Sequence, residues 1–183
     1  MLEVARTHFA RGGPRIRDTF PAVLSCYFQL AVAHSTSNEA VVEASDLARR
    51  SLMIASQMIS ALNSDELFEN ALRLYVQAAS VASACSLDSV AYEFFVSAFT
   101  VYEENISETK AQIASLTLII GALQSSCIFS AESYDILSNK CVLHSARLLK
   151  KPDQCRSVLL SAHLFWVTTG PRDNVVGAYR IVS

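Results

Sequence analysis

The sequence predicts an all-α fold of antiparallel helical hairpins, and three observations support this prediction. The 183 residues include only five Gly and four Pro, and most of these gather at a few positions between apolar segments. No segment sustains the apolar–polar alternation that is typical of a half-buried strand. The segments between the breaks have the length of helices and are joined by very short connections, so consecutive helices must lie antiparallel.

The expected helices follow one another along the whole chain. In order, they cover residues 1–10, 15–34, 39–62, 64–86, 88–104, 107–125, 130–150 and 152–168. Asn63, followed three residues later by Glu66, forms a capping-box pattern before the fourth helix. The side chains of Asp88, Ser107 and Ser130 are expected to accept hydrogen bonds from first-turn N–H groups of the next three helices.

Pro152 is expected at the first position of the last helix, where its missing N–H would have had no partner. The preceding residue, Lys151, is then disfavoured in the helical region. The previous helix is therefore predicted to end at about Lys150.

The spacing of the helices indicates a repeat. Taken in pairs, residues 39–86, 88–125 and 130–168 give units of about 38–48 residues, which is typical of a HEAT-like α-solenoid. The prediction is one solenoid segment over residues 1–183, although self-similarity is weak and a plain helical bundle stays open.

The last helix is apolar on more than one side, which favours a helix packed between neighbours in a stack. Leu160 and Leu164 point away from the main apolar stripe. That stripe consists of Cys155, Val158, Leu159, Ala162 and Trp166.

Composition argues against several classes of partner. A net charge of −2 and a pI near 6.1 give no bulk attraction to nucleic acid or to an anionic membrane. Charged residues make up 17% of the chain, against roughly 25% in an average soluble domain, and hydrophobic residues make up 51%. A larger share of the surface than usual is therefore expected to be apolar or covered by partners.

No stretch is expected to span a membrane. The most apolar one, residues 111–129, contains Gln and Ser and is predicted to be a buried helix. The N-terminus lacks the apolar core of a signal peptide. The five cysteines are odd in number and contain no C-x-x-C pair, so they are predicted to be free thiols in a reducing cytosol.

The sequence gives no catalytic constellation. His8, His34, His144 and His163 are scattered, and none lies four residues from another. There is no Gly-rich phosphate loop and no G-x-S-x-G motif. The chain is therefore predicted to be non-enzymatic and to need no metal or cofactor.

Two groups of charges stand out. Glu103 and Glu104 end the helix over 88–104, where the backbone carbonyls already carry partial negative charge. They form either a solvated helix end or an acidic surface for a basic partner. Arg147, Lys150 and Lys151 are placed at the end of the helix over 130–150, where the dipole favours cations. They are explained structurally or as a complementary surface on a second copy, in a weak and salt-sensitive contact.

Two long stretches resemble one known family. They are "VAYEFFVSAFTVYEENISETKAQIASLTLIIGAL" (residues 90–123) and "LLKKPDQCRSVLLSAHLFW" (residues 148–166), with weaker similarity in "ARTHFARGGPRIRDTFP" and "YFQLA" near the start. They resemble the C-terminal half of the retromer large-subunit family, vacuolar protein sorting-associated protein 35. The resemblance fades after Trp166, where the family continues with further helices, so the chain is expected to be truncated with an apolar end exposed.

The resemblance implies a HEAT-like α-solenoid that acts as a scaffold on the cytosolic face of endosomes, in retrograde protein transport. Its C-terminal half binds the metallophosphoesterase-fold small subunit, vacuolar protein sorting-associated protein 29, against its concave side. Cargo tails and Rab-pathway regulators are further partners that the resemblance allows.

The resemblance also implies roles for particular residues. His163 matches the family's contact histidine for the small subunit, and Ser25 and Val32 occupy two positions that are aromatic contacts in the family. Phe28, assigned to the same face of its helix, is a candidate to compensate. The five charged residues match the family's self-association surface: Glu103, Glu104, Arg147, Lys150 and Lys151.

Two other functional classes are weighed against the scaffold. One is a helical adaptor that grips linear cargo peptides in grooves between helices. The other is a helical enzyme, which would need a cleft that joins a histidine to a nucleophile.

Overall fold

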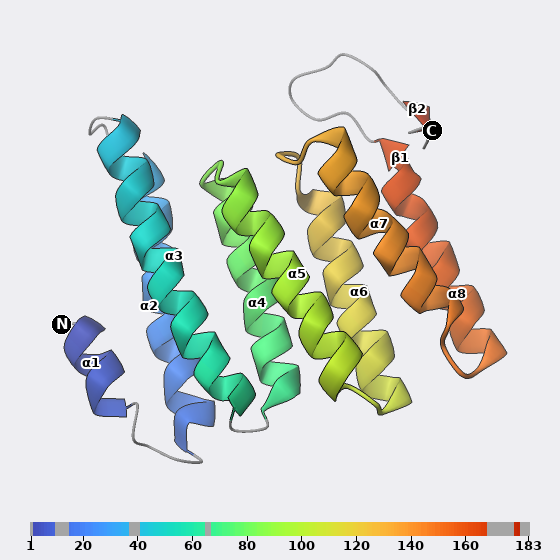
Figure 1. The fold of residues 1–183 in the computed structure, drawn as a ribbon, viewed down its shortest axis with the longest axis horizontal. Helices are drawn as coiled ribbons and strands as arrows, with labels where there is room; N and C mark the ends of the chain where they lie inside the picture. Colours follow the sequence, from blue (N-terminus) through green and yellow to red (C-terminus); the bar gives the residue numbers. More distant parts are fainter. Residues whose placement is uncertain (1, 10–14, 37–40, 65–66, 168–177, 180–183) are drawn as a thin grey trace. The chain divides into compact units, whose positions relative to one another are not determined.

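The structure is a computed structural model that describes residues 2–9, 15–36, 41–64, 67–167 and 178–179. It divides into two compact units, unit 1 (Met1–Asn105) and unit 2 (Ile106–Ser183). Within each unit, antiparallel helices pack against their neighbours along the chain, as in a HEAT-like α-solenoid (Figure 1). The predicted all-α class is confirmed, and the single segment over 1–183 stays a prediction.

Unit 1 contains the first five helices. These are α1 (Leu2–Phe9), α2 (Ile16–Thr36), α3 (Val41–Ser64), α4 (Phe68–Ala84) and α5 (Asp88–Asn105). The most extensive packing joins α4 to α5 and α2 to α3. The hairpins of unit 1 are thus α2–α3 and α4–α5, so the pairing predicted for residues 39–86 is shifted by one helix.

The core of unit 1 follows from apolar residues at helical spacing. On α2, Leu24, Phe28 and Ala31 lie one turn apart and are buried. On α5, Phe95 and Phe99 are both fully buried. Between α4 and α5, the rings of Tyr75 and Phe94 lie tilted with centroids 6.3 Å apart, within the range of favourable aromatic pairs.

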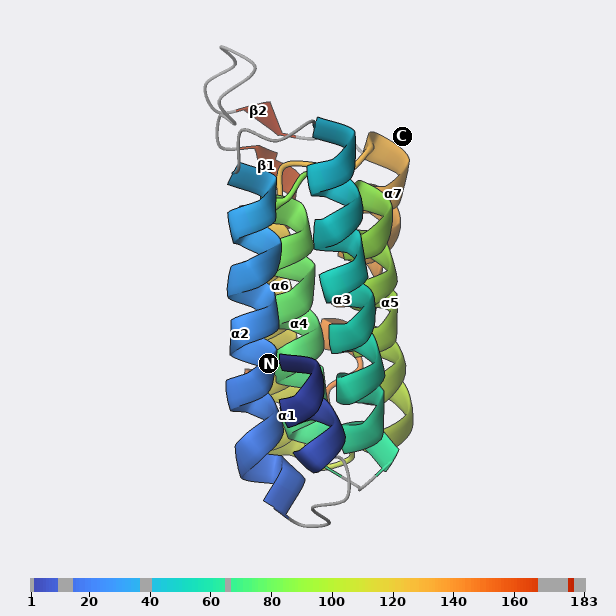
Figure 2. The same ribbon diagram turned by 90° about the vertical axis from the view of Figure 1, so that its left-hand side faces the viewer.

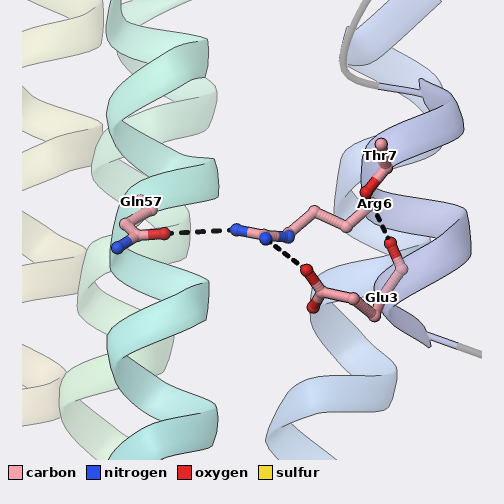
Figure 3. A network of polar contacts seen from close by, with 4 residues as sticks. All are labelled: Glu3, Arg6, Thr7 and Gln57. Carbon is pink, nitrogen blue, oxygen red and sulfur yellow. Dashed lines mark hydrogen bonds and ion pairs between the residues drawn. The ribbon is translucent and has the colours of Figure 1, made fainter.

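One arginine links helix α1 to α3. Figure 2 shows α1 lying against α2 and α3. Arg6 Nη1 donates to Gln57 Oε1 of α3 over 3.2 Å, and its Nη2 pairs with Glu3 one turn earlier (Figure 3). Because the guanidinium is planar, it reaches both partners at once and connects segments 51 residues apart.

Unit 2 contains three helices, a single 3₁₀ turn and one strand pair among its described residues. They are α6 (Thr109–Ser125), α7 (Ala131–Ala146), α8 (Lys151–Ala162), η2 (His163–Phe165), β1 (Trp166–Val167) and β2 (Ala178–Tyr179). Residues 111–129 were predicted to be a buried helix, and α6 buries one face that includes Leu116, Ile119 and Ile120.

The last helix is shorter than predicted. It ends at Ala162 instead of 168, and β1 pairs with β2 in an antiparallel register that places Trp166 opposite Tyr179. At this helix end the Tyr134 hydroxyl of α7 donates to the Leu164 carbonyl over 2.9 Å. This hydrogen bond satisfies a carbonyl of the 3₁₀ turn and so favours termination there.

The predicted caps were right in two cases and wrong in two. Ser130 caps α7, with its Oγ accepting from the Ser133 N–H, and Asp88 Oδ1 accepts from the Ser89 N–H. Asn63 lies inside the last turn of α3, because this helix runs on to Ser64 and α4 begins after Leu67 without a side-chain cap. Glu108, not Ser107, occupies the cap position of α6.

The α7–α8 interface is lined by serine instead of the predicted stripe. Ser157 and Ser161 of α8 are buried, whereas Leu159 is 64% exposed. Ser161 Oγ donates to the Ser157 carbonyl over 2.8 Å, so the hydroxyl of Ser145 on α7 must donate the 2.9 Å bond that joins it to Ser161. Small side chains with satisfied hydroxyls let two helices approach closely, which overrides the apolar pattern.

The other described residues of the predicted apolar stripe are also exposed. Cys155, Val158 and Ala162 are exposed as well, while Leu164, predicted to point away from the stripe, is buried. The side chain of Trp166 lies outside the described residues.

Candidate functional site

Helix α2 exposes one face that carries two of the predicted small-subunit contacts. Ser25 and Val32 lie seven residues apart, with Gln29 between them on the same face, and all three are exposed. The Ser25 hydroxyl donates to the Pro21 carbonyl over 2.9 Å, so its polar group is already satisfied within the helix. Val32, which is 37% exposed, offers apolar area to a partner.

Phe28 does not extend this face. Only 4% of its surface is exposed, because it lies one turn from Leu24 on the side of α2 that packs into unit 1. Its assignment to the same face as Ser25 and Val32 is therefore corrected. The structure gives Phe28 a role in the core, and an exposed aromatic group is missing from the α2 face.

His163 stands at the point where α8 ends. It occupies the C-cap, its backbone N–H donates to the carbonyls of Leu160 and Ser161, and its ring is exposed. The prediction placed it on the flank of a continuing helix. The 3₁₀ turn instead presents the imidazole at a helix end, where the ring has one donor and one acceptor to offer when it is neutral.

Glu103 and Glu104 lie in the last turn of α5, as predicted, and both are exposed. The helix dipole disfavours negative charge at this end. The last turn of α5 holds no basic residue.

The basic residues lie differently from the prediction. Helix α7 ends at Ala146, so Arg147 is its C-cap, but Lys150 is the N-cap of α8 and Lys151 is its first residue. Pro152 consequently occupies the second helical position, and the extended backbone falls on Lys150 instead of Lys151. Two of the three cations thus lie at a helix N-terminus, where the dipole disfavours positive charge.

The α7–α8 turn is fixed by one side chain. The Gln154 amide Nε2 donates to the carbonyls of Ala146 and Leu148, over 2.8 and 2.6 Å, and its Oε1 accepts from Lys151 Nζ over 3.1 Å. These bonds satisfy carbonyls left open where α7 ends. In this turn Leu148 is 3% exposed and Leu149 is 83% exposed.

Comparison with known proteins identifies the family of this chain. The family model for vacuolar protein sorting-associated protein 35 matches residues 1–182. The chain belongs to the vacuolar protein sorting-associated protein 35 family.

Similar proteins of this family include members from a plant and a yeast. Vacuolar protein sorting-associated protein 35B of Arabidopsis thaliana is 46% identical over 90% of this chain, and protein 35C of the same plant is 43% identical over 91%. Vacuolar protein sorting-associated protein 35 of Schizosaccharomyces pombe is 32% identical over 95% of the chain. The chain spans 21% of the length of each of these three relatives.

In this member of the vacuolar protein sorting-associated protein 35 family, the predicted contact residues fall in both units. Ser25, Val32 and the two glutamates belong to unit 1, whereas His163 and the three cations belong to unit 2. The sequence analysis did not predict that Leu149 is exposed in a turn. The reason is that the helix predicted over 130–150 includes Leu149 as one residue of a regular apolar pattern. The signal that could have revealed it is Gln154, a side chain able to cap the preceding helix from beyond Pro152.

Neither a metal cluster nor a membrane span is found in the described part of the chain. No three or more His, Cys, Asp or Glu side chains among those residues are grouped so as to hold a metal ion. Within the same residues, every helix is too short or too polar to cross a bilayer.

Proposed function

We propose that the chain is a segment of a retromer large subunit and acts as a non-enzymatic scaffold in endosomal retrograde transport. The observation that carries this proposal is the family match over residues 1–182, together with the hairpin architecture of both units. Its place of action is the cytosolic face of endosomes.

The partner proposed for this segment is the metallophosphoesterase-fold small subunit, vacuolar protein sorting-associated protein 29. Two exposed features support it, the α2 face with Ser25 and Val32 and the ring of His163. An exposed imidazole ring and a partly apolar helix face match the mixed character of non-obligate protein interfaces.

A calorimetric titration of the small subunit into the chain tests this proposal. The parent is expected to bind one to one, and His163→Ala to weaken binding by about 1–3 kcal/mol, because a buried polar contact is lost. His8→Ala, which removes an exposed histidine of α1, serves as the control and should leave the affinity unchanged. Equal affinities for all three proteins would remove His163 from the interface, and no binding by the parent would reject the partner.

A substitution that is expected to increase the affinity for the small subunit tests the α2 face separately. Val32→Phe restores an aromatic ring on the exposed face and should tighten binding, by up to about tenfold, because more apolar area is buried. Phe28→Ala, by contrast, should act through stability, since Phe28 is 4% exposed. A Val32→Phe variant that binds no more tightly than the parent argues against this face as the contact.

We also propose self-association through the charged residues, because of where the structure places them. Glu103 and Glu104 lie at a C-terminus, and Lys150 and Lys151 at an N-terminus, so the dipole of their own helix opposes each pair. Oppositely charged groups from a second copy would relieve both. Lys150→Glu/Lys151→Glu should therefore abolish a concentration-dependent shift in sedimentation that the parent shows at low salt. Profiles that do not differ between variant and parent would reject the contact.

A further inference from the structure

Helix α8 fully buries none of its own apolar side chains. It has 12 residues, and the two that are buried are serines, Ser157 and Ser161. Of its apolar residues, Val158 and Leu159 are exposed and Leu160 is only half-buried. Burial of apolar surface is the main source of free energy that holds a helix in a fold, and α8 has little of it.

Helix α6 of the same unit shows the opposite arrangement. Four of its apolar side chains are fully buried: Leu116, Ile119, Ile120 and Leu123. An opening of α6 would return this apolar surface to water, whereas an opening of α8 would break the Ser145–Ser161 hydrogen bond and expose two serine side chains. The two helices are therefore expected to differ in the free energy needed to open them.

Two hydrogen bonds hold α8 at its ends. Just before the helix, the Leu148 carbonyl accepts from Gln154 Nε2 over 2.6 Å. Just after it, the Leu164 carbonyl accepts from the Tyr134 hydroxyl over 2.9 Å. Leu148 and Leu164 are both buried, so each bond lies beside a side chain that is anchored in unit 2. We call these two bonds the start clamp and the end clamp of α8.

The start clamp has a counterpart at α6. Gln112 Nε2 donates to the Ile106 carbonyl over 3.0 Å, and in both turns the glutamine lies six residues beyond the carbonyl that it holds. Ile106 is buried, as Leu148 is. The same bond thus precedes a helix with a buried apolar face and a helix without one, which makes Gln112 a matched control for Gln154.

We propose that α8 opens as one unit while α6 and α7 stay folded, and that the two clamps set how often it opens. Elements with few buried apolar contacts lie at the low-stability end of a fold and open locally. His163 is the C-cap of α8, so this equilibrium also determines for how much of the time its ring is presented at a helix end. The inference does not depend on the partner proposed for that ring.

Amide hydrogen exchange of the 183-residue chain, measured in increasing urea, tests the opening. In the parent, amides of α8 should exchange about tenfold faster or more than those on the buried face of α6. Their rates should hardly depend on urea, because a local opening exposes little surface. Equal rates and equal urea dependence for α6 and α8 would overturn the proposal, since both helices would then open only in global unfolding.

Removal of one clamp at a time tests what holds the helix. Gln154→Ala and Tyr134→Phe should each speed exchange in α8 by roughly three- to tenfold, because the lost bond no longer opposes the opening. Gln112→Ala removes the counterpart bond, which stays intact when only α8 opens, so exchange in α8 should not change. If Gln112→Ala and Gln154→Ala accelerate exchange in α8 equally, the helix exchanges through global unfolding and the proposal is wrong.

The two clamp variants back each other up. Should Gln154→Ala fail to fold, which circular dichroism detects, Tyr134→Phe keeps the aromatic ring in place and still removes the end clamp. A rate of exchange in α8 that neither variant changes overturns the role of the clamps, even where the parent shows a local opening.

Discussion

Ser86 carries the one left-handed backbone conformation of a non-glycine residue in the described chain, with φ of 59°. It closes α4 in a Schellman arrangement. The Leu87 N–H donates to the Ala82 carbonyl over 3.0 Å, and the Ser86 N–H donates to the Ser83 carbonyl over 3.1 Å. This geometry brings α4 and α5 into their hairpin, and it has a steric cost for any residue with a Cβ atom.

Ser86→Gly should therefore stabilise unit 1. We expect the free energy of unfolding to rise by about 0.5–1 kcal/mol, because glycine adopts this conformation without a Cβ clash. Ser80→Gly, in the regular part of α4, should lower it by a similar amount. Urea denaturation of the two variants measures both changes, and a Ser86→Gly variant less stable than the parent would contradict the assignment of the turn.

Cys141 makes stability depend on pH in the alkaline range. Burial raises the pKa of its thiol from 9.0 to about 12, because the thiolate is poorly solvated inside unit 2. Between these two values the folded chain holds a proton that the unfolded chain has lost. The free energy of unfolding should thus fall as pH rises above 9, by up to about 1.4 kcal/mol per pH unit from this group.

The measurement is urea denaturation at pH 8, 9 and 10, with Cys141→Ala as the comparison. The variant should be less stable at pH 8, because it leaves a cavity, yet lose less stability as pH rises. Burial also raises the pKa of Tyr102, to about 12. This group therefore adds the same pH dependence to the free energy of unfolding of the parent and of the Cys141→Ala variant. Parallel pH profiles for parent and variant would contradict the role of Cys141.

Among elements, the interiors of the helices were predictable, and the ends of α7 and α8 were not. Apolar periodicity located every described helix, since the spacing of residues such as Phe95 and Phe99 depends only on local sequence. The end of α7 at Ala146 depends instead on Gln154, and the end of α8 coincides with a bond from Tyr134, 30 residues away from Leu164. The bond from Tyr134 is a tertiary contact that the local sequence does not encode, whereas Gln154 is a local signal that apolar periodicity alone does not register.

The same reasoning explains which site residues were misplaced. Glu103 and Glu104 lie within a helix that ends as predicted, so their position was right. Lys150 and Lys151 depend on where α7 ends, and Phe28 depends on which side of α2 meets α3 and α4. Periodicity gives the angle between two residues on a helix but not which side faces the core.

The caps provide a direct test at the level of elements. Ser130→Ala should lower the free energy of unfolding by about 1 kcal/mol, because the Ser133 N–H loses its acceptor. Ser107→Ala is the matched control, since the sequence predicted an equal role for Ser107 and the structure places Glu108 at the cap. Thermal denaturation of the two variants compares them, and equal losses would mean that Ser107 also caps α6.

For the whole molecule, the central feature is the amount of apolar surface that each unit leaves uncovered. Three leucines of unit 2 are each more than half exposed: Leu143, Leu149 and Leu159. This agrees with the high share of hydrophobic residues in the chain, which is 51%. The part of this chain that aligns with the Arabidopsis relative covers only 21% of that protein's length. Both facts fit a scaffold whose surfaces are completed by contacts with other segments or subunits, and they predict binding as its mode of action.

Hydrogen exchange with and without the small subunit tests this account most directly, because it reports every contact surface in one experiment. Binding should slow exchange in α2 around Ser25 to Val32 and in the turn that carries His163, and leave the backbone around Leu149 unchanged. A complex that protects neither α2 nor the turn after α8, or a chain with no protection at all, would contradict the proposed scaffold.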